Sequence, residues 1–230
     1  TKEILSRLCQ RLDKMVDATK GNLNNLFGVP LTLLGASLES PWWVIEMGTN
    51  QFGEIKELSR ITKPDGAILT SISQSHLEFL KNTQGVAKEK RDIMQGMPPD
   101  SVLVLPADLK HLELIREHAA KKGVRLIRYA IDDSNLKAEW KLTLKKNDLE
   151  GSVFELFGLE FELGKVNPIQ LKNLTASLVL LHESGVDPAR LQKLTPGLEM
   201  SVPGRFEWKR FDQGWLVDDS YNANPGSFFG

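Results

Sequence analysis

The sequence predicts an α/β fold in which a mostly parallel sheet is flanked by helices. Short apolar runs, such as residues 101–106 (SVLVLP), have the length of buried strands. Stretches with helical spacing of apolar residues, such as 108–123, separate these runs, and this alternation is typical of parallel sheets with crossover helices. Residues 139–165 instead alternate polar and apolar residues between turn signals. They predict a small antiparallel β-hairpin subregion.

The predicted elements follow one another in a regular order. A polar, Gly- and Asn-rich loop at 19–30 separates the first helix from the first strand, and Pro64 ends the second helix. We expect strands at 41–48, 65–73, 101–106 and 124–130. We expect helices at 1–16, 53–64, 85–97, 108–123 and 168–185.

The composition is that of an ordinary soluble globular protein. Of the 230 residues, 41% are hydrophobic and 26% are charged, and the formal net charge is -1. No block of like charge indicates nucleic acid or a membrane surface as a partner, and no apolar run approaches the roughly 18 residues of a membrane span. The single cysteine, Cys9, excludes an internal disulfide framework and is typical of a reducing compartment.

Two polar side chains are expected at neighbouring strand ends. Glu46 ends the apolar run PWWVIEMG, and His76 comes just after DGAILTSIS. Ligands of parallel α/β sheets bind outside the carboxyl ends of the strands, where a carboxylate and an imidazole can share a divalent cation. The alternatives are that Glu46 caps the next segment and that His76 is a surface or packing residue.

A lysine lies on the apolar face of the helix predicted at 85–97. Val86, Ile93 and Met97 form one stripe at helical spacing, and Lys90 lies on the same stripe. Lys90 either extends its ammonium group to solvent along its methylenes or has a role inside the protein. The other charged residues of this helix are expected on its solvated face: Lys88, Glu89, Arg91 and Asp92.

Two motifs near the end of the chain could also bind a ligand. Arg205 follows a tight turn in VPGRFE and could hold a phosphate or a carboxylate in bidentate fashion, or it could be a surface arginine. The stretch DDSYNANP places polar side chains after a strand, which suits a ligand loop, an interdomain hinge or an ordinary Asx turn.

Together these motifs resemble those of the Mur ligases. The resemblance rests on TKGNLNNLFGVPLTLL, VIEMGTNQFGEIKELSRITKPDGAILTSISQSHLEFL, VAKEKRDI, VPGRFE and DDSYNANP, which occur in this order along nearly the whole chain. Within the family the pattern is most similar to the MurF type. A MurE-type or folylpolyglutamate-synthetase-type ligase remains an alternative, although NLNN and DDSYNANP argue against it.

The resemblance implies an ATP-dependent carboxylate–amine ligase of peptidoglycan synthesis in the bacterial cytoplasm. Such an enzyme would add D-Ala-D-Ala to UDP-MurNAc-tripeptide through an acyl-phosphate intermediate, using ATP and one or two Mg²⁺ ions. A UDP-MurNAc-peptide and a dipeptide amine would be its substrates, and we expect a monomer.

The resemblance also implies a domain organisation. Residues 1–212 would form the central ATPase domain, and 213–230 would be the hinge and the start of the C-terminal domain. The family's phosphate-binding loop would lie just before Thr1, and Lys2 is not its phosphate-binding lysine. By itself the chain is therefore expected to be catalytically incompetent.

Site residues are implied in the same way. Glu46 would bind one magnesium ion and His76 a second, and Lys90 matches a lysine that is carbamylated in several Mur ligases. Lys90, His76 and Arg205 would act in catalysis. The remaining roles concern nucleotide and substrate: Asn173 near the adenine, Arg205 at the phosphates, Asp219 near the ribose, and Asn24 with Asn25 at the muropeptide.

The sequence departs from the family pattern at several positions. The usual His-Asn-x-x-Asn has Ile169 and Gln170 in its first two places, which puts the adenine contacts in doubt. Pro106 and Leu109 replace polar residues, and Lys81 replaces a glycine. These departures indicate a divergent member of the family.

Overall fold

The structure, a computed structural model, describes residues 1–73, 77–148, 150–205, 207–212 and 214–221. The chain divides into two compact units, Thr1–Leu198 and Glu199–Gly230. The predicted domain limit between residues 212 and 213 stays a prediction.

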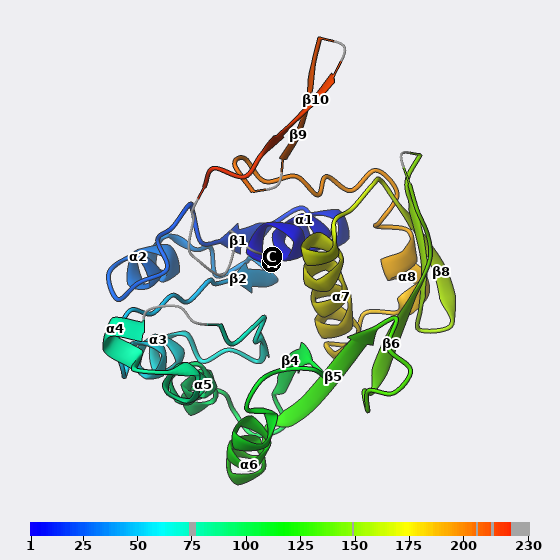
Figure 1. Ribbon diagram of the computed structural model, residues 1–230. Helices are drawn as coiled ribbons and strands as arrows, with labels where there is room; N and C mark the ends of the chain where they lie inside the picture. Colours follow the sequence, from blue (N-terminus) through cyan, green and yellow to red (C-terminus); the bar gives the residue numbers. More distant parts are fainter. Residues whose placement is uncertain (74–76, 149, 206, 213, 222–230) are drawn as a thin grey trace. The chain divides into compact units, whose positions relative to one another are not determined.

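The first unit contains a six-stranded sheet in the order β3-β4-β5-β6-β7-β8, of which Figure 1 labels β4, β5, β6 and β8. The pairs from β3 to β6 are parallel, and the pairs β6–β7 and β7–β8 are antiparallel. The predicted fold class is confirmed, including the antiparallel subregion. The strand bounds are β3 Gly66–Ile68, β4 Val102–Pro106, β5 Arg125–Ile131, β6 Trp140–Asn147, β7 Ser152–Leu156 and β8 Leu159–Leu163.

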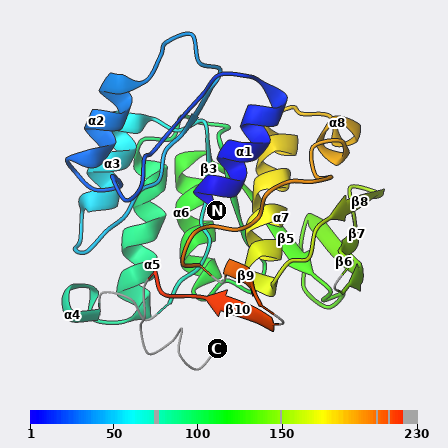
Figure 2. The same ribbon diagram turned by 90° about the horizontal axis from the view of Figure 1, so that it is seen from above.

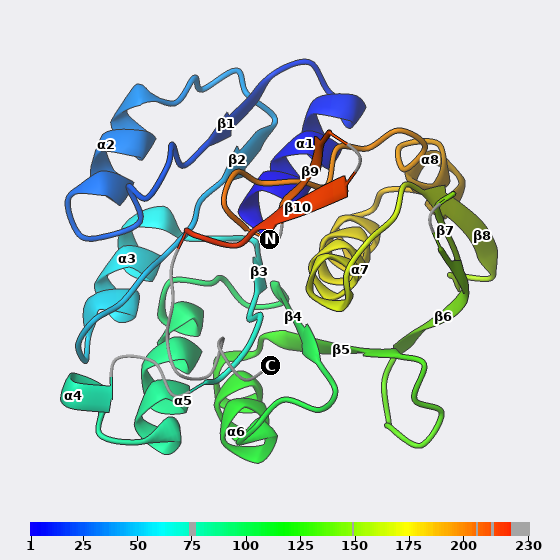
Figure 3. The ribbon, with the colours of Figure 1, turned by 45° about the horizontal axis from the view of Figure 1, so that its top comes forward.

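Helices cover both faces of the parallel part of this sheet. Strand β4 shows why, because Val102 and Val104 pack with residues of α7 while Leu103 and Leu105 pack with residues of α5 and α6. Strands buried on both faces read as continuous apolar runs, as SVLVLP does. Figure 3 shows the strands curving around α7 (Pro168–Glu183), and Figure 2 shows α1 (Lys2–Leu12) beside it.

On the other face, α3, α5 and α6 follow one another (Figure 3). The predicted helix at 85–97 is an α-helix only to Arg91, and a 3₁₀ turn, η1, continues it. The bounds are α3 Glu54–Thr62, α4 Leu77–Leu80, α5 Thr83–Arg91, η1 Asp92–Gln95, α6 Leu112–Lys122 and α8 Pro188–Gln192. Within the described ranges no helix is both long and apolar enough to cross a membrane.

A separate two-stranded parallel sheet pairs β1 (Val16–Ala18) with β2 (Trp42–Val44). The prediction of a helix to residue 16 is wrong, because α1 ends at Leu12 and β1 begins four residues later. Asp13 takes an extended conformation, and its carboxylate accepts a hydrogen bond from Trp42 Nε1 at 2.5 Å. This contact with a distant tryptophan favours the strand and cannot be read from local periodicity.

Helix α2 (Gly28–Gly35) was not predicted from the sequence. It begins inside the loop expected at 19–30, where Asn25 Oδ1 accepts hydrogen bonds from the backbone N–H groups of Phe27 and Gly28. Its leucines are spread around the helix, and Leu31 and Leu34 are exposed. Because no amphipathic stripe forms, the periodicity of the sequence gives no helical signal here.

The second unit contains one antiparallel hairpin of β9 (Glu207–Phe211) and β10 (Gly214–Asp218). Asp218 accepts hydrogen bonds from the Lys209 ammonium at 2.8 Å and from the Ser220 hydroxyl at 2.6 Å. These two partners lower the pKa of the Asp218 carboxyl group to about 2. The hairpin is therefore supported by a cross-strand charge pair at its open end.

Candidate functional site

Glu46 lies two residues beyond the end of β2, as the sequence predicts for a strand-end acid. Its backbone N–H donates to the hydroxyl of the buried Thr19 at 2.9 Å. Its Oε1 accepts a hydrogen bond of 2.7 Å from Asn24 Nδ2. Both the backbone and the carboxylate of Glu46 are thus held by the segment that follows β1.

The two asparagines of NLNN have different surroundings. The Asn24 side-chain amide donates to the Glu46 carboxylate, and the backbone carbonyl of Asn24 accepts a 2.7 Å hydrogen bond from Gly48 N–H. Gly48 permits this approach, since a Cβ there would lie 2.9 Å from the Asn24 side chain. Asn25 uses its Oδ1 to cap α2. The predicted muropeptide role of both residues stays a prediction.

Lys2, the first residue of α1, binds the segment that follows β1. Its ammonium donates to the carbonyl of Thr19 at 2.6 Å and to that of Gly21 at 3.2 Å, and it pairs with Glu3 at 2.7 Å. The Lys2 side chain is only 8% exposed. The sequence analysis gave Lys2 no role, because the carbonyls that it binds lie 17 and 19 residues away.

Asn173, predicted near the adenine, is half-buried on α7 and contacts the start of α1. Its Oδ1 accepts a hydrogen bond of 2.6 Å from the Thr1 hydroxyl. Asn173 is thus hydrogen-bonded to Thr1, the residue before Lys2. Hydrogen bonds continue from Lys2 through Thr19 and Glu46 to Asn24. We call these six residues, joined by hydrogen bonds and by the Thr1–Lys2 peptide bond, the α1 network.

Lys90 is partly buried on α5, and its Nζ donates to the Ser71 carbonyl at 2.7 Å. Ser71 comes three residues after the end of β3, so the amine is held just beyond a strand end. Burial lowers the pKa of the Lys90 ammonium group because the charged form loses solvation. His76, the predicted second metal ligand, lies outside the described residues.

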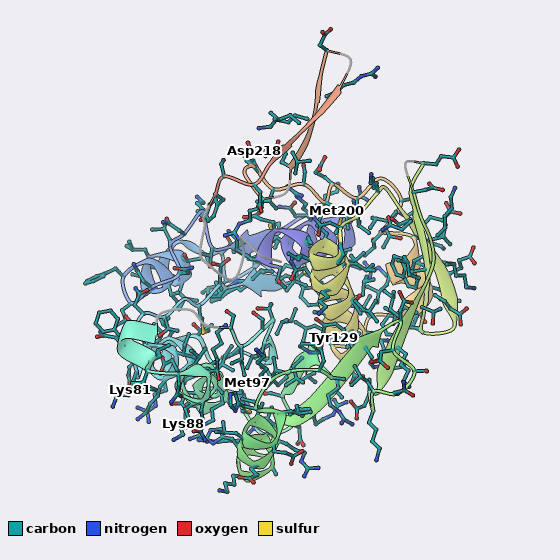
Figure 4. The ribbon with its side chains drawn as sticks, in the orientation of Figure 1. Lys81, Lys88, Met97, Tyr129, Met200 and Asp218 are labelled. Carbon is teal, nitrogen blue, oxygen red and sulfur yellow. The ribbon has the colours of Figure 1, made fainter. Side chains whose placement is uncertain are left out.

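The prediction that Glu89 lies on the solvated face of this helix is wrong. Glu89 is 1% exposed. Its Oε2 accepts from Gly53 N–H at 2.7 Å and its Oε1 from Ile55 N–H at 2.8 Å. The carboxylate thus binds the N-terminus of α3, where backbone N–H groups have no partner within the helix. By contrast, Lys88 is exposed and lies at the outer side of α5 (Figure 4), as predicted.

In the second unit, Arg205 and the segment after β10 lie together. The Arg205 guanidinium stacks over the Tyr221 ring at 3.9 Å from its centre, and Tyr221 N–H donates to the Gly204 carbonyl at 2.8 Å. Asp219, two residues before Tyr221, is exposed. The structure therefore joins VPGRFE to the start of DDSYNANP, while the nucleotide roles of Arg205 and Asp219 stay predictions.

The comparisons with known proteins agree with this arrangement. Residues 1–181 match the family described as the Mur ligase middle domain. The chain belongs to the Mur ligase family. The resemblance inferred from the motifs is thereby confirmed.

Two curated relatives of this Mur ligase chain carry the same name. The UDP-N-acetylmuramoyl-tripeptide–D-alanyl-D-alanine ligase of Bacillus subtilis is 32% identical over 218 residues, which are 92% of this chain and 45% of the relative. The ligase of the same name from Escherichia coli is 31% identical over 216 residues, 91% of this chain and 46% of the relative. The chain thus spans about half the length of the curated relatives that it matches.

A solved structure of similar fold is the MurF ligase of Thermotoga maritima in complex with ADP. It is 28% identical, with a TM-score of 0.79, and the match covers 99% of this chain and 53% of that one.

The donor set of this Mur ligase chain suits magnesium only in part. Within the ranges that the structure describes, no group of three or more His, Cys, Asp or Glu side chains could hold a metal ion. Mg²⁺ in nucleotide sites is usually bound through one or two carboxylates together with substrate phosphates. Glu46, whose carboxylate is held by Asn24, fits that pattern as a single protein carboxylate.

Proposed function

We propose that this chain is the ATP-binding central part of a ligase that adds D-Ala-D-Ala to UDP-MurNAc-tripeptide. The observation that carries the proposal is the α1 network, because it links Asn173, predicted near the nucleotide, with Glu46, a predicted metal ligand, through residues at the start of α1. The names of the curated relatives support the choice of substrates. A UDP-MurNAc-peptide and a dipeptide amine would be the partners, and the reaction would take place in a monomer in the bacterial cytoplasm.

The chemistry would proceed in two steps. The γ-phosphoryl group of ATP moves to the substrate carboxylate, which gives an acyl phosphate and ADP. The amine then attacks the acyl carbon, so that an amide forms and inorganic phosphate and a proton leave. Phosphoryl transfer depends on positioning and charge neutralisation. The guanidinium of Arg205 would supply part of that neutralisation.

The remaining predicted roles belong to this proposal. Mg²⁺, held by Glu46, His76 and the modified Lys90, would offset the negative charge of the phosphates when bound. Asp219 would bind near the ribose, and Asn24 with Asn25 would line the entry of the muropeptide. Residues 213–230 would begin the hinge to a C-terminal domain.

We also propose that Lys90 is carbamylated. Burial lowers the pKa of its ammonium group and so raises the neutral fraction of the amine. The neutral amine can add CO₂ to give a carbamate with release of one proton, and the carbamate offers two oxygen ligands. NMR in ¹³C-labelled bicarbonate should show a carbamate signal that Lys90→Arg removes and Lys88→Arg keeps. Loss of the signal in both variants, or its absence from the wild-type chain, would refute the modification.

Phosphate release tests the function. The chain extended at both ends along its own gene should release phosphate only when ATP, UDP-MurNAc-tripeptide and D-Ala-D-Ala are all present. Glu46→Ala in that protein should lower turnover by roughly 100-fold or more. Glu57→Ala, on the exposed side of α3, is the control and should keep full turnover. Turnover without the muropeptide, or normal turnover in Glu46→Ala, would contradict the proposal. Full activity of the 230-residue chain alone would show that the expected dependence on a preceding phosphate-binding loop is wrong.

A further inference from the structure

Glu89 is a fully buried carboxylate for which the proposed reaction has no direct use. Three potential donors surround it: the N–H groups of Gly53 and Ile55, at 2.7 and 2.8 Å, and, at 3.2 Å, the Thr49 hydroxyl, which lies closer to the Gln51 carbonyl, at 2.8 Å. A buried carboxylate is costly unless it is hydrogen-bonded in this way. The hydrogen bonds to residues 49–55 therefore depend on the charge and on the shape of the Glu89 carboxylate.

All three donors belong to residues 49–55, the segment that follows Glu46 and begins α3. A second carboxylate supports the same turn, since Glu54 Oε2 accepts from the N–H groups of Asn50 and Gln51 at 2.6 and 3.0 Å. The Thr49 hydroxyl also lies 3.2 Å from Glu54 Oε2, so Glu54 and its donors lie within one stretch of six residues. Glu89 differs because it reaches this turn from α5, 34 to 40 residues further along the chain.

The opposite end of α3 is fastened to the same neighbour. The Ser59 hydroxyl donates to the Ile93 carbonyl and accepts from Gly96 N–H at 2.9 Å. Gly96 allows this contact, because a Cβ there would overlap the Ser59 backbone. Helix α3 is therefore held to the segment α5–η1 at two points, by Glu89 near its start and by Ser59 near its end.

We propose that Glu89 is a positioning residue that sets the turn after Glu46 against the helix that carries Lys90. Lys90 is the next residue of α5, and only two residues separate Glu46 from the first donor, Thr49. Glu89 acts through these neighbours and contacts no reacting atom. The inference rests on the proposed function, since it assigns Glu89 to the alignment of two residues in that reaction.

An amide cannot replace this carboxylate. Both oxygens of Glu89 accept from backbone N–H groups, and glutamine would turn its own NH₂ group toward one of those donors. Glu89→Gln keeps the volume of the side chain but should release Gly53 or Ile55. A displacement of about 1 Å at a catalytic group can lower turnover by roughly 100-fold.

The test combines kinetics with hydrogen exchange. In the chain extended along its own gene, Glu89→Gln should lower kcat by roughly 10- to 100-fold and leave the KM for D-Ala-D-Ala within about twofold. Glu57→Gln, an exposed glutamate of α3, is the matched control and should keep kcat. Ser59→Ala loosens the other end of α3, so it should lower the melting temperature while leaving kcat within about threefold.

The outcomes separate the two proposals. Equal losses of kcat in Glu89→Gln and Ser59→Ala, when both are folded at the assay temperature, would overturn the positioning role and leave only a stabilising one. Unchanged kcat in Glu89→Gln would overturn it as well. If the wild-type protein has no ligase activity, the proposed function fails. Exchange of the Gly53 and Ile55 amides in the 230-residue chain, expected to be faster in Glu89→Gln and unchanged in Glu57→Gln, still decides whether Glu89 holds the turn.

Discussion

The α3–α5 region and the β6–β8 layer both contain many charged residues, yet they use them in opposite ways. In the α3–α5 region the Glu89 carboxylate is buried and accepts from a helix N-terminus. In the β6–β8 layer, Lys145 pairs with Glu155 at 2.8 Å and with Glu160 at 3.4 Å, and all three side chains are more than 40% exposed. The comparison shows that equal pairing distances say little about energetic importance, because solvent screens the exposed pairs.

The interior of the β6–β8 layer is mostly apolar, with the buried Ser152 as an exception. Phe154 and Phe161 are completely buried and stack with their ring centres 5.2 Å apart. This layer is held by burial of large side chains, whereas residues 49–97 combine an apolar core with buried, hydrogen-bonded polar groups. The candidate site residue Glu46 lies just before residues 49–97, and Lys90 lies within them.

The largest expected effect tests the apolar side of this comparison. Phe154→Ala should lower the free energy of unfolding by about 3–5 kcal/mol, because it removes buried surface and leaves a cavity. Urea unfolding followed by circular dichroism would measure it. Glu155→Ala, on the exposed face of the same strand, should leave the unfolding midpoint nearly unchanged. A similar loss in both variants would mean that the layer does not depend on its aromatic core.

A buried hydroxyl in α3 tests the polar side. Ser59→Ala should cost about 1–3 kcal/mol of unfolding free energy, because the Ile93 carbonyl and Gly96 N–H lose their shared partner. Thr62→Val is the matched control on the same helix, since the buried Thr62 hydroxyl finds no hydrogen-bond partner among the described residues. That variant should be neutral or slightly stabilising. A larger loss of unfolding free energy in Thr62→Val than in Ser59→Ala would contradict the stabilising role of the Ser59 hydrogen bonds.

The stability cost of burying the Lys90 ammonium group should depend on pH. Its pKa in the folded chain lies below the ordinary value of 10.5, so the unfolded chain binds more protons between the two values. The penalty of burying the charge is therefore complete below the folded pKa and fades as the pH rises toward 10.5. In CO₂-free buffer, the melting temperature of Lys90→Met relative to wild type should be higher at pH 7 than at pH 10. Lys88→Met, at an exposed position, should show no such trend.

The smallest effect is expected at the exposed charges of the β6–β8 layer. Lys145→Met should leave the unfolding midpoint within experimental scatter at physiological salt, since its partners are solvated. Thermal melts at about 20 mM NaCl, where screening is weak, and at about 500 mM NaCl, where it is strong, would reveal any contribution of these ion pairs to stability. A large, salt-independent loss would erase the contrast between the two regions.

Local patterns were sufficient for much of the fold. The continuous apolar run at 101–106 predicted a strand buried on both faces, and the structure shows Val104 and Leu103 on opposite sides of β4. The position of Glu46 just past a strand was also predicted, because a strand followed by polar and glycine residues can be recognised within one short window. Helix α2 and strand β1 escaped prediction, since neither has a periodic apolar face.

The sequence by itself determined the alternation of strands and helices, the order of the family motifs and the residues that follow the strand ends. Only the tertiary structure decided that Glu89 is buried, that Asn25 caps a helix while Asn24 binds Glu46, and that Lys2 and Thr19 belong to the α1 network. The physical reason is the distance along the chain. The donors of Glu89 lie 34 to 40 residues away. Local sequence therefore predicts a solvated glutamate, because the hydrogen-bond partners come close only in the folded chain.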